Sequence, residues 1–224
     1  MASCFLFPFG IEKHSQKNDP KTDKHHIETY TDAELKRLLR KPDVRYCNFA
    51  TYRSWVIVNL LLSTGIRQNS LVNIKIKDLD FDNRVIYVNI TKNRKPLIIP
   101  LNEDIVKILH EYLKYRQGQP DDWLFISTYG DQLNRSSCYH GLWDYSHYCG
   151  VDKTGVHRFR HTFAKKWITM GGSVVTLQKI LGHSSLDITE TYLNILTTDL
   201  KKDMDEINII RSLKQDHIKL RKTD

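Results

Sequence analysis

Residues 153–183, KTGVHRFRHTFAKKWITMGGSVVTLQKILGH, say more about this chain than any other stretch of its sequence. Their periodicity predicts one helix over 157–170 and a second over 174–181. The stretch holds six Lys or Arg, three His and no Asp or Glu. A segment with this charge is expected to meet an anionic partner.

The first of these helices has two contrasting faces. One face gathers four residues at helical spacing: His157, Arg160, His161 and Ala164. The roughly opposite face gathers three aromatic residues: Phe159, Phe163 and Trp167. We expect the aromatic stripe to be buried and the cationic edge to point into a site.

Two histidines at i and i+4 also suggest a metal pair, or simple surface histidines. A zinc helix of this kind needs a carboxylate base and usually a third ligand, whereas His157 and His161 enclose two arginines. Metal is therefore the weaker interpretation.

Working towards the N-terminus, TDAE at 31–34 is a capping box that starts a helix through Leu38. A longer apolar helix is predicted from about 49 to 63. Gly65 ends this helix, which leaves Arg67 at a junction.

RVIYVNI at 84–90 and KPLIIPL at 95–101 are rich in β-branched residues and alternate, which predicts a β-hairpin with Lys92 on its turn. Helices are expected over 102–115, from an Asn134 or Ser136 cap to about 148, over 189–196 and over 200–213. The fold class is therefore α+β, mainly α-helical, with a small antiparallel sheet.

The whole chain has 224 residues, with 34 Lys or Arg against 26 Asp or Glu and a formal net charge of +8. This balance favours nucleic acid as the partner. No apolar stretch approaches the roughly 20 residues that span a bilayer, so no membrane partner is expected. The cysteines form no CxxC pair, which predicts free thiols in a reducing interior: Cys4, Cys47, Cys138 and Cys149.

Specific motifs then accumulate in one order. HRFR at 157–160 has a histidine directly after it, and in LGHSSLDITETYLNI, at 181–195, His183 stands nine residues before Tyr192. This pattern resembles the signature of the tyrosine recombinase, or phage integrase, family.

Two upstream motifs extend the resemblance. STGIRQNSL at 63–71 resembles the arginine-bearing turn of the family, and TKNRKPLIIPL at 91–101 resembles its lysine-bearing β-turn. The resemblance implies a tyrosine recombinase catalytic-domain fold and six catalytic positions: Tyr192, Arg67, Lys92, His157, Arg160 and His183.

The implied activity cuts and rejoins DNA through a covalent 3′-phosphotyrosine at Tyr192, without metal, ATP or another cofactor. Arg67 and Arg160 would clamp the phosphate, because two guanidiniums suit the charge on two non-bridging oxygens. His157 would be the base for the phenol. Lys92 would be the acid for the leaving hydroxyl, and a histidine, His183, would hydrogen-bond a non-bridging oxygen.

Two departures from the family pattern qualify these assignments. Lys92 competes with Arg94 and Lys95 for the turn role, since Thr91 and Asn93 replace the family's glycines, and we retain Lys92 because it stands eight residues before Pro100. Ser70 replaces a glutamate that often supports the first arginine. Non-catalytic DNA contacts are expected from three residues: Arg94, Lys95 and Lys165.

The expected domain plan is a linker or N-terminal arm over 1–27, a catalytic domain over 28–198, and a C-terminal helix or tail over 199–224. The tail either packs on its own domain or is exchanged between protomers. The family's additional DNA-binding domain would stand upstream, so we expect this chain alone to bind DNA weakly and with a steep salt dependence.

Expected partners are double-stranded DNA attachment sites and, on DNA, further copies of the chain in a tetramer; without DNA it would be monomeric or weakly associated. The expected location is the nucleoid-associated cytoplasm of a bacterial or phage-infected cell. The role would be integration or excision of a mobile element. One alternative is a type IB topoisomerase, against which the small size and the integrase-like HRFR and LGH contexts argue. The other is a non-catalytic DNA-binding remnant, against which the complete catalytic set argues.

Overall fold

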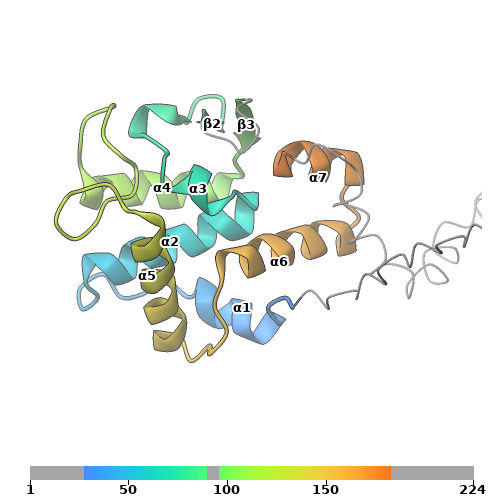
Figure 1. The fold of residues 1–224 in the computed structure, drawn as a ribbon, viewed down its shortest axis with the longest axis horizontal. Helices are drawn as coiled ribbons and strands as arrows, with labels where there is room; N and C mark the ends of the chain where they lie inside the picture. The colour runs from blue at the N-terminus through green and yellow to red at the C-terminus, as the bar shows by residue number, and fades with distance from the viewer. Residues whose placement is uncertain (1–27, 90–95, 183–224) are drawn as a thin grey trace, which may run out of the picture.

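The apolar helix predicted from the sequence forms α2, Phe49–Thr64, and lies at the centre of the computed structural model, which describes residues 28–89 and 96–182 (Figure 1). Asn48 caps its start by accepting a hydrogen bond from the backbone N–H of Thr51 at 2.8 Å. Most of its side chains are buried, because other helices pack around it. These helices are α1 (Asp32–Leu39), α4 (Glu103–Arg116), α5 (Arg135–Tyr148) and α6 (Val156–Thr169).

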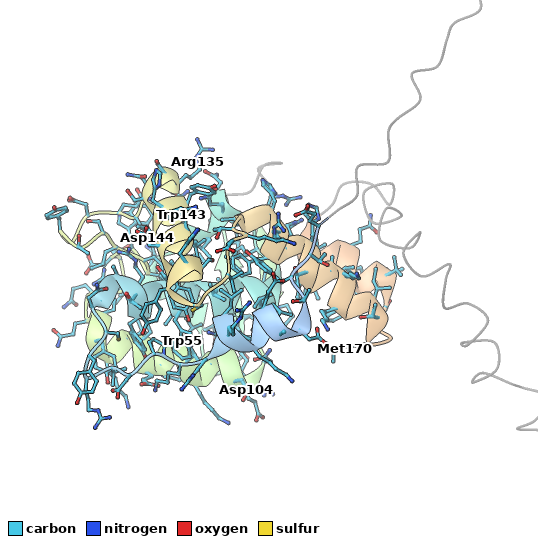
Figure 2. The ribbon with its side chains drawn as sticks, turned by 90° about the horizontal axis from the view of Figure 1, so that it is seen from below. Trp55, Asp104, Arg135, Trp143, Asp144 and Met170 are labelled. Atoms are coloured by element: carbon cyan, nitrogen blue, oxygen red, sulfur yellow. The ribbon has the colours of Figure 1, made fainter. Side chains whose placement is uncertain are left out.

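The predicted caps set the limits of several helices. Thr31 and Glu34 form the capping box of α1, Asn134 rather than Ser136 caps α5, and Asn102 caps α4. At the far end of α1, the indole N–H of Trp55 donates to the carbonyl of Leu39 at 3.0 Å and ties α1 to α2 (Figure 2). The predicted limits of these helices are confirmed to within about two residues, the usual uncertainty of helix ends.

The predicted hairpin is also confirmed. Strands β2 (Val85–Val88) and β3 (Leu97–Pro100) are antiparallel, with Val85 opposite Pro100 and Val88 opposite Leu97. A third strand, β1 (Leu79–Asp80), pairs with β2 after the 3₁₀ helix η1 (Ile76–Asp78). These two short elements were not predicted, because their apolar pattern is too brief to have a period.

The helix of the HRFR motif, α6, differs from its predicted two-faced form. Phe159 and Phe163 are buried as expected, but Arg160 and Ala164 on the other face are buried as well. The reason is that α2 and α7 (Val174–Leu181) both contact α6, and Arg160 donates to carbonyls at their ends. The side chain of Arg160 therefore makes its contacts inside the protein.

Several sequence-based expectations lie outside the described residues: the arm over 1–27, the turn over 91–94 and the helices over 189–196 and 200–213. Cys47, Cys138 and Cys149 are free thiols, and Cys4 is outside the described ranges. Within those ranges, no helix has both the length and the apolar character needed to cross a membrane.

Gly65 ends α2 in the left-handed region, with φ of 59°, and faces two buried side chains. A Cβ atom at this position would lie 2.5 Å from Cδ1 of Phe163 and 2.8 Å from Cδ2 of Leu181. Gly171 also has a positive φ, 80°, but a Cβ there would meet nothing within 4 Å. Comparing the same substitution at the two glycines therefore distinguishes the cost of backbone strain from the cost of steric crowding.

Gly65→Ala should lower the free energy of unfolding by about 1–3 kcal/mol more than Gly171→Ala, because only the first adds overpacking to the left-handed strain. Urea unfolding followed by circular dichroism measures both. Equal losses in the two variants would show that the close approach at Gly65 does not matter.

Candidate active site

Arg160 is a buried cross-link between three segments that are distant in the sequence. It stands in the second turn of α6 with only 6% of its surface exposed. Its Nη1 donates to the carbonyl of Gly65 at 2.6 Å and its Nη2 donates to the carbonyl of Leu181 at 2.7 Å. Both acceptors lie at the C-terminal ends of helices, where the backbone carries partial negative charge. The site is therefore built on carbonyl groups at the ends of α2 and α7.

Arg67 meets the same end of α7. It is the N-cap residue of the one-turn helix α3 (Gln68–Leu71), and its Nη2 donates to the carbonyl of Gly182 at 3.3 Å. The guanidinium is half-buried, and this burial lowers the pKa of Arg67 below its ordinary value. An arginine is charged at neutral pH all the same.

The structure brings Arg67 and Arg160 together as the sequence predicts, since their acceptors are the consecutive residues Leu181 and Gly182. Carbonyl groups orient a guanidinium without cancelling its formal charge. Among the described residues, the ion pairs do not include Arg67. Its half-exposed charge is thus available to an anion.

His157 and His161 lie one turn apart near the start of α6, the first exposed and the second half-buried. Burial is the main cause that lowers the pKa of His161, and the nearby charges of His157 and Arg160 act in the same direction. The predicted grouping of these three side chains on one face is consistent with this electrostatic coupling. In the described part of the chain, no three potential metal ligands gather in one place.

Four other predicted site residues lie outside the described ranges: Lys92, Arg94, Lys95 and Tyr192. His183 is also outside them, although it follows Gly182 directly in the chain. Their positions remain predictions from the sequence.

The basic window around α6 is less available than its composition indicates. The segment around the start of α1 lies against α6: Glu28, before the helix, pairs with Arg158 at 2.6 Å, and Asp32, the first residue of α1, pairs with Lys166. Lys165, a predicted DNA contact, lines a pocket of about 280 Å³ beside this segment with Asp32 and four threonines, Thr29, Thr31, Thr162 and Thr169, among its neighbours. Part of the positive charge is thus matched within the protein.

Sequence reasoning missed the residues that hold the two arginines. Gly182 takes the left-handed C-cap of α7, with φ of 59°, and its carbonyl receives Arg67. Its place after an apolar helix is the signal that would have found the cap. Gln68, beside Arg67, donates to the carbonyl of Arg135 at 2.8 Å, and no sequence signal marks that contact.

Comparison with known sequences finds one matching family and several similar proteins. The model of the Phage integrase family matches residues 28–198. Tyrosine recombinase XerD of Proteus mirabilis is 29% identical over 189 residues, which cover 81% of this chain and 59% of that protein. Tyrosine recombinase XerC of Staphylococcus epidermidis is 30% identical over 187 residues, covering 82% of this chain and 62% of XerC. The chain therefore spans about three fifths of the length of these relatives.

Two solved structures have the same fold. The crystal structure of XerA recombinase has a TM-score of 0.68 at 29% identity and covers 85% of this chain and 66% of that one. The Tn1549 transposon integrase, solved in complex with a circular intermediate DNA, has a TM-score of 0.63 at 26% identity and covers 76% and 62%.

The lowered pKa of His161 predicts a pH dependence of stability. The unfolded chain, with an ordinary histidine pKa of 6.5, binds more protons at acid pH than the folded chain does. The contribution of His161 to the free energy of unfolding is thus complete above pH 6.5 and is lost as the pH falls below it. His161→Gln should lose less free energy of unfolding than the wild type between about pH 7.5 and 5.5. Urea titrations at both pH values measure this, and an unchanged or steeper loss in the variant would contradict it.

Proposed function

Because this chain belongs to the phage integrase family, we propose that residues 28–198 are the catalytic domain of a site-specific tyrosine recombinase. The observation that carries the proposal is the meeting of Arg67 and Arg160 at one end of α7, each held by backbone carbonyls. Such a pair suits a DNA phosphodiester, whose transition state concentrates negative charge on two non-bridging oxygens.

In the proposed reaction the phenol oxygen of Tyr192 attacks the phosphorus, a 3′-phosphotyrosine bond forms and the bond to the 5′ oxygen breaks. A free tyrosine has a pKa of about 10, so the phenol needs help to lose its proton at neutral pH. His157 is exposed at the start of α6, and its charge is close enough to help lower the pKa of His161. His157 is the proposed base. The positive field of the arginines assists it.

The 5′ oxygen leaves as a hydroxyl after Lys92 gives it a proton, and His183 hydrogen-bonds a non-bridging oxygen. A 5′-hydroxyl of the partner strand then reverses the attack and frees the tyrosine. The phosphotyrosine bond keeps the energy of the phosphodiester, so the cycle is complete in protons and bonds without ATP or a metal ion.

The proposed substrates are double-stranded DNA attachment sites, at which the chain would integrate or excise a mobile element as part of a homotetramer. Residues 199–224 carry an apolar stripe formed by Leu200, Met204, Ile207 and Ile210, which suits docking on a neighbouring protomer. Residues 1–27 would be the arm that enters this domain. Alone, the chain would bind DNA weakly, in the cytoplasm and near the nucleoid, since Arg158 and Lys166 already pair with carboxylates.

Tyr192→Phe should abolish covalent attachment to a nicked duplex that carries a cognate site while leaving DNA binding nearly intact, because only the nucleophilic oxygen is lost. Denaturing gels reveal the adduct, and gel shifts measure binding. The matched control is Tyr129→Phe, which removes the hydroxyl of a tyrosine that is 92% exposed and should form the wild-type amount of adduct. EDTA should change neither result. A DNA adduct in Tyr192→Phe contradicts the proposal.

Lys92→Ala should slow cleavage of the normal substrate strongly, but should cleave almost normally when sulfur replaces the 5′ bridging oxygen, because a thiolate leaves without a proton. Lys95→Ala is the control. If that variant is rescued by the sulfur and Lys92→Ala is not, Lys95 rather than Lys92 is the acid.

A further inference from the structure

The helix that carries Arg67 at its N-cap is too short to hold its own position. α3 has four residues, and one helical turn has no independent stability in water. Arg67 makes no side-chain cap for α3, because a guanidinium has no acceptor for the N–H groups of the helix, and it donates to the carbonyl of Gly182. The place of Arg67 therefore depends on what anchors α3 to the rest of the domain.

Gln68 provides such an anchor on α5. Its side-chain amide donates to the carbonyl of Arg135, the first residue of α5, at 2.8 Å. The same amide lowers the pKa of the thiol of Cys138, which is buried almost one turn further along the helix. Burial outweighs this effect and raises the pKa of Cys138 to about 11, so the thiol is neutral at physiological pH.

α5 is a firm reference for this contact. Its Gly141 carbonyl accepts a hydrogen bond from Ser54 of α2 at 3.1 Å, and its Tyr145 hydroxyl donates to the carbonyl of Leu38 in α1 at 2.8 Å. Arg135 opens the helix at the edge of the molecule, as Figure 2 shows. Gln68, the residue next to Arg67, is thus joined to a helix that is fixed to the core.

We propose that Gln68 is a positioning residue for the phosphate-binding Arg67, which it holds in place by joining α3 to the first turn of α5 through its side-chain amide. The inference rests on the proposed function. Arg67 is then fixed on both sides. Two residues before it, the carbonyl of Gly65 accepts a hydrogen bond from Arg160, and directly after it, Gln68 donates to the carbonyl of Arg135.

The opposite end of α3 offers a matched control. The side chain of Gln132 donates to the carbonyl of Val72 and to Oδ1 of Asn73, both at 3.0 Å. Gln132 anchors the same short helix with the same chemical group, but at the end away from Arg67. Loss of the Gln68 amide removes one hydrogen bond to a backbone carbonyl, and loss of the Gln132 amide removes two hydrogen bonds, one of them to a backbone carbonyl. By the proposal, only loss of the Gln68 amide frees the arginine.

The experiment compares Gln68→Met with Gln132→Met, since methionine keeps the length of the side chain and removes its donor. Single-turnover formation of the Tyr192 adduct at saturating protein gives the rate constant of cleavage. Gel shifts give the Kd for DNA, and thermal unfolding gives Tm. Both glutamine variants are also made in an Arg67→Lys background, and Gln68→Ala repeats the loss of the donor with another side chain.

Gln68→Met and Gln68→Ala should slow cleavage at least tenfold with a Kd within twofold of the wild type, because a displacement of about 1 Å at a reacting group can cost on the order of 10²-fold in rate. Gln132→Met should stay within twofold of the wild-type rate. In the Arg67→Lys background, Gln68→Met should add less than a twofold loss, because the guanidinium it positions is already gone.

Two results overturn the inference while the proposed function stands: equal slowing by Gln68→Met and Gln132→Met in step with Tm, or a full tenfold loss by Gln68→Met in the Arg67→Lys background. A wild-type protein that forms no adduct at Tyr192 on any attachment-site substrate overturns the proposed function itself, and the inference with it.

Discussion

The structure depends on one buried guanidinium. A charge enclosed in a protein interior must be hydrogen-bonded, and Arg160 meets this requirement with two backbone carbonyls, those of Gly65 and Leu181. These carbonyls are the ends of α2 and α7, so the need to satisfy one side chain fixes where two helices stop and how they face α6. The neighbouring arginine, Arg67, then uses the next carbonyl along, that of Gly182. The contacts that satisfy the buried guanidinium therefore also assemble the proposed phosphate site.

Local rules account for most of what the sequence predicted. The capping box of Thr31 and Glu34, the left-handed Gly65 and the alternation in β2 and β3 are each decided within a few residues, and each is confirmed. The burial of Arg160 and the partner of Gln68 are decided by contacts 95 and 67 residues away in the sequence, which no local pattern contains. On α6, periodicity predicted the burial of Phe159 and Phe163 but not that of Arg160, which donates to the carbonyl of Leu181 at the end of α7.

Charge counting had the same limitation. The window over 153–183 has no acidic residue of its own, yet two of its basic side chains pair with Glu28, before α1, and Asp32, the first residue of α1. Thr162 of α6 also accepts the backbone N–H of Tyr30, and the rings of Tyr30 and Phe159 lie 4.6 Å apart. The chain that enters the domain is therefore fastened along the helix that carries His157 and Arg160. A displacement of the chain before α1 would therefore act directly on the position of α6.

The long sequence separations have a consequence for biosynthesis. Arg160 joins Gly65, 95 residues before it, to Leu181, 21 residues after it, while Tyr30 waits 132 residues for Thr162. Contacts of this span form late in folding, and a ribosome delivers the chain from its N-terminus. A nascent chain that has not yet reached α7 holds both arginines but lacks the carbonyls that would converge them. The arrangement proposed for DNA cleavage consequently arises only when synthesis of the domain is nearly finished, so incomplete chains on the ribosome would lack it.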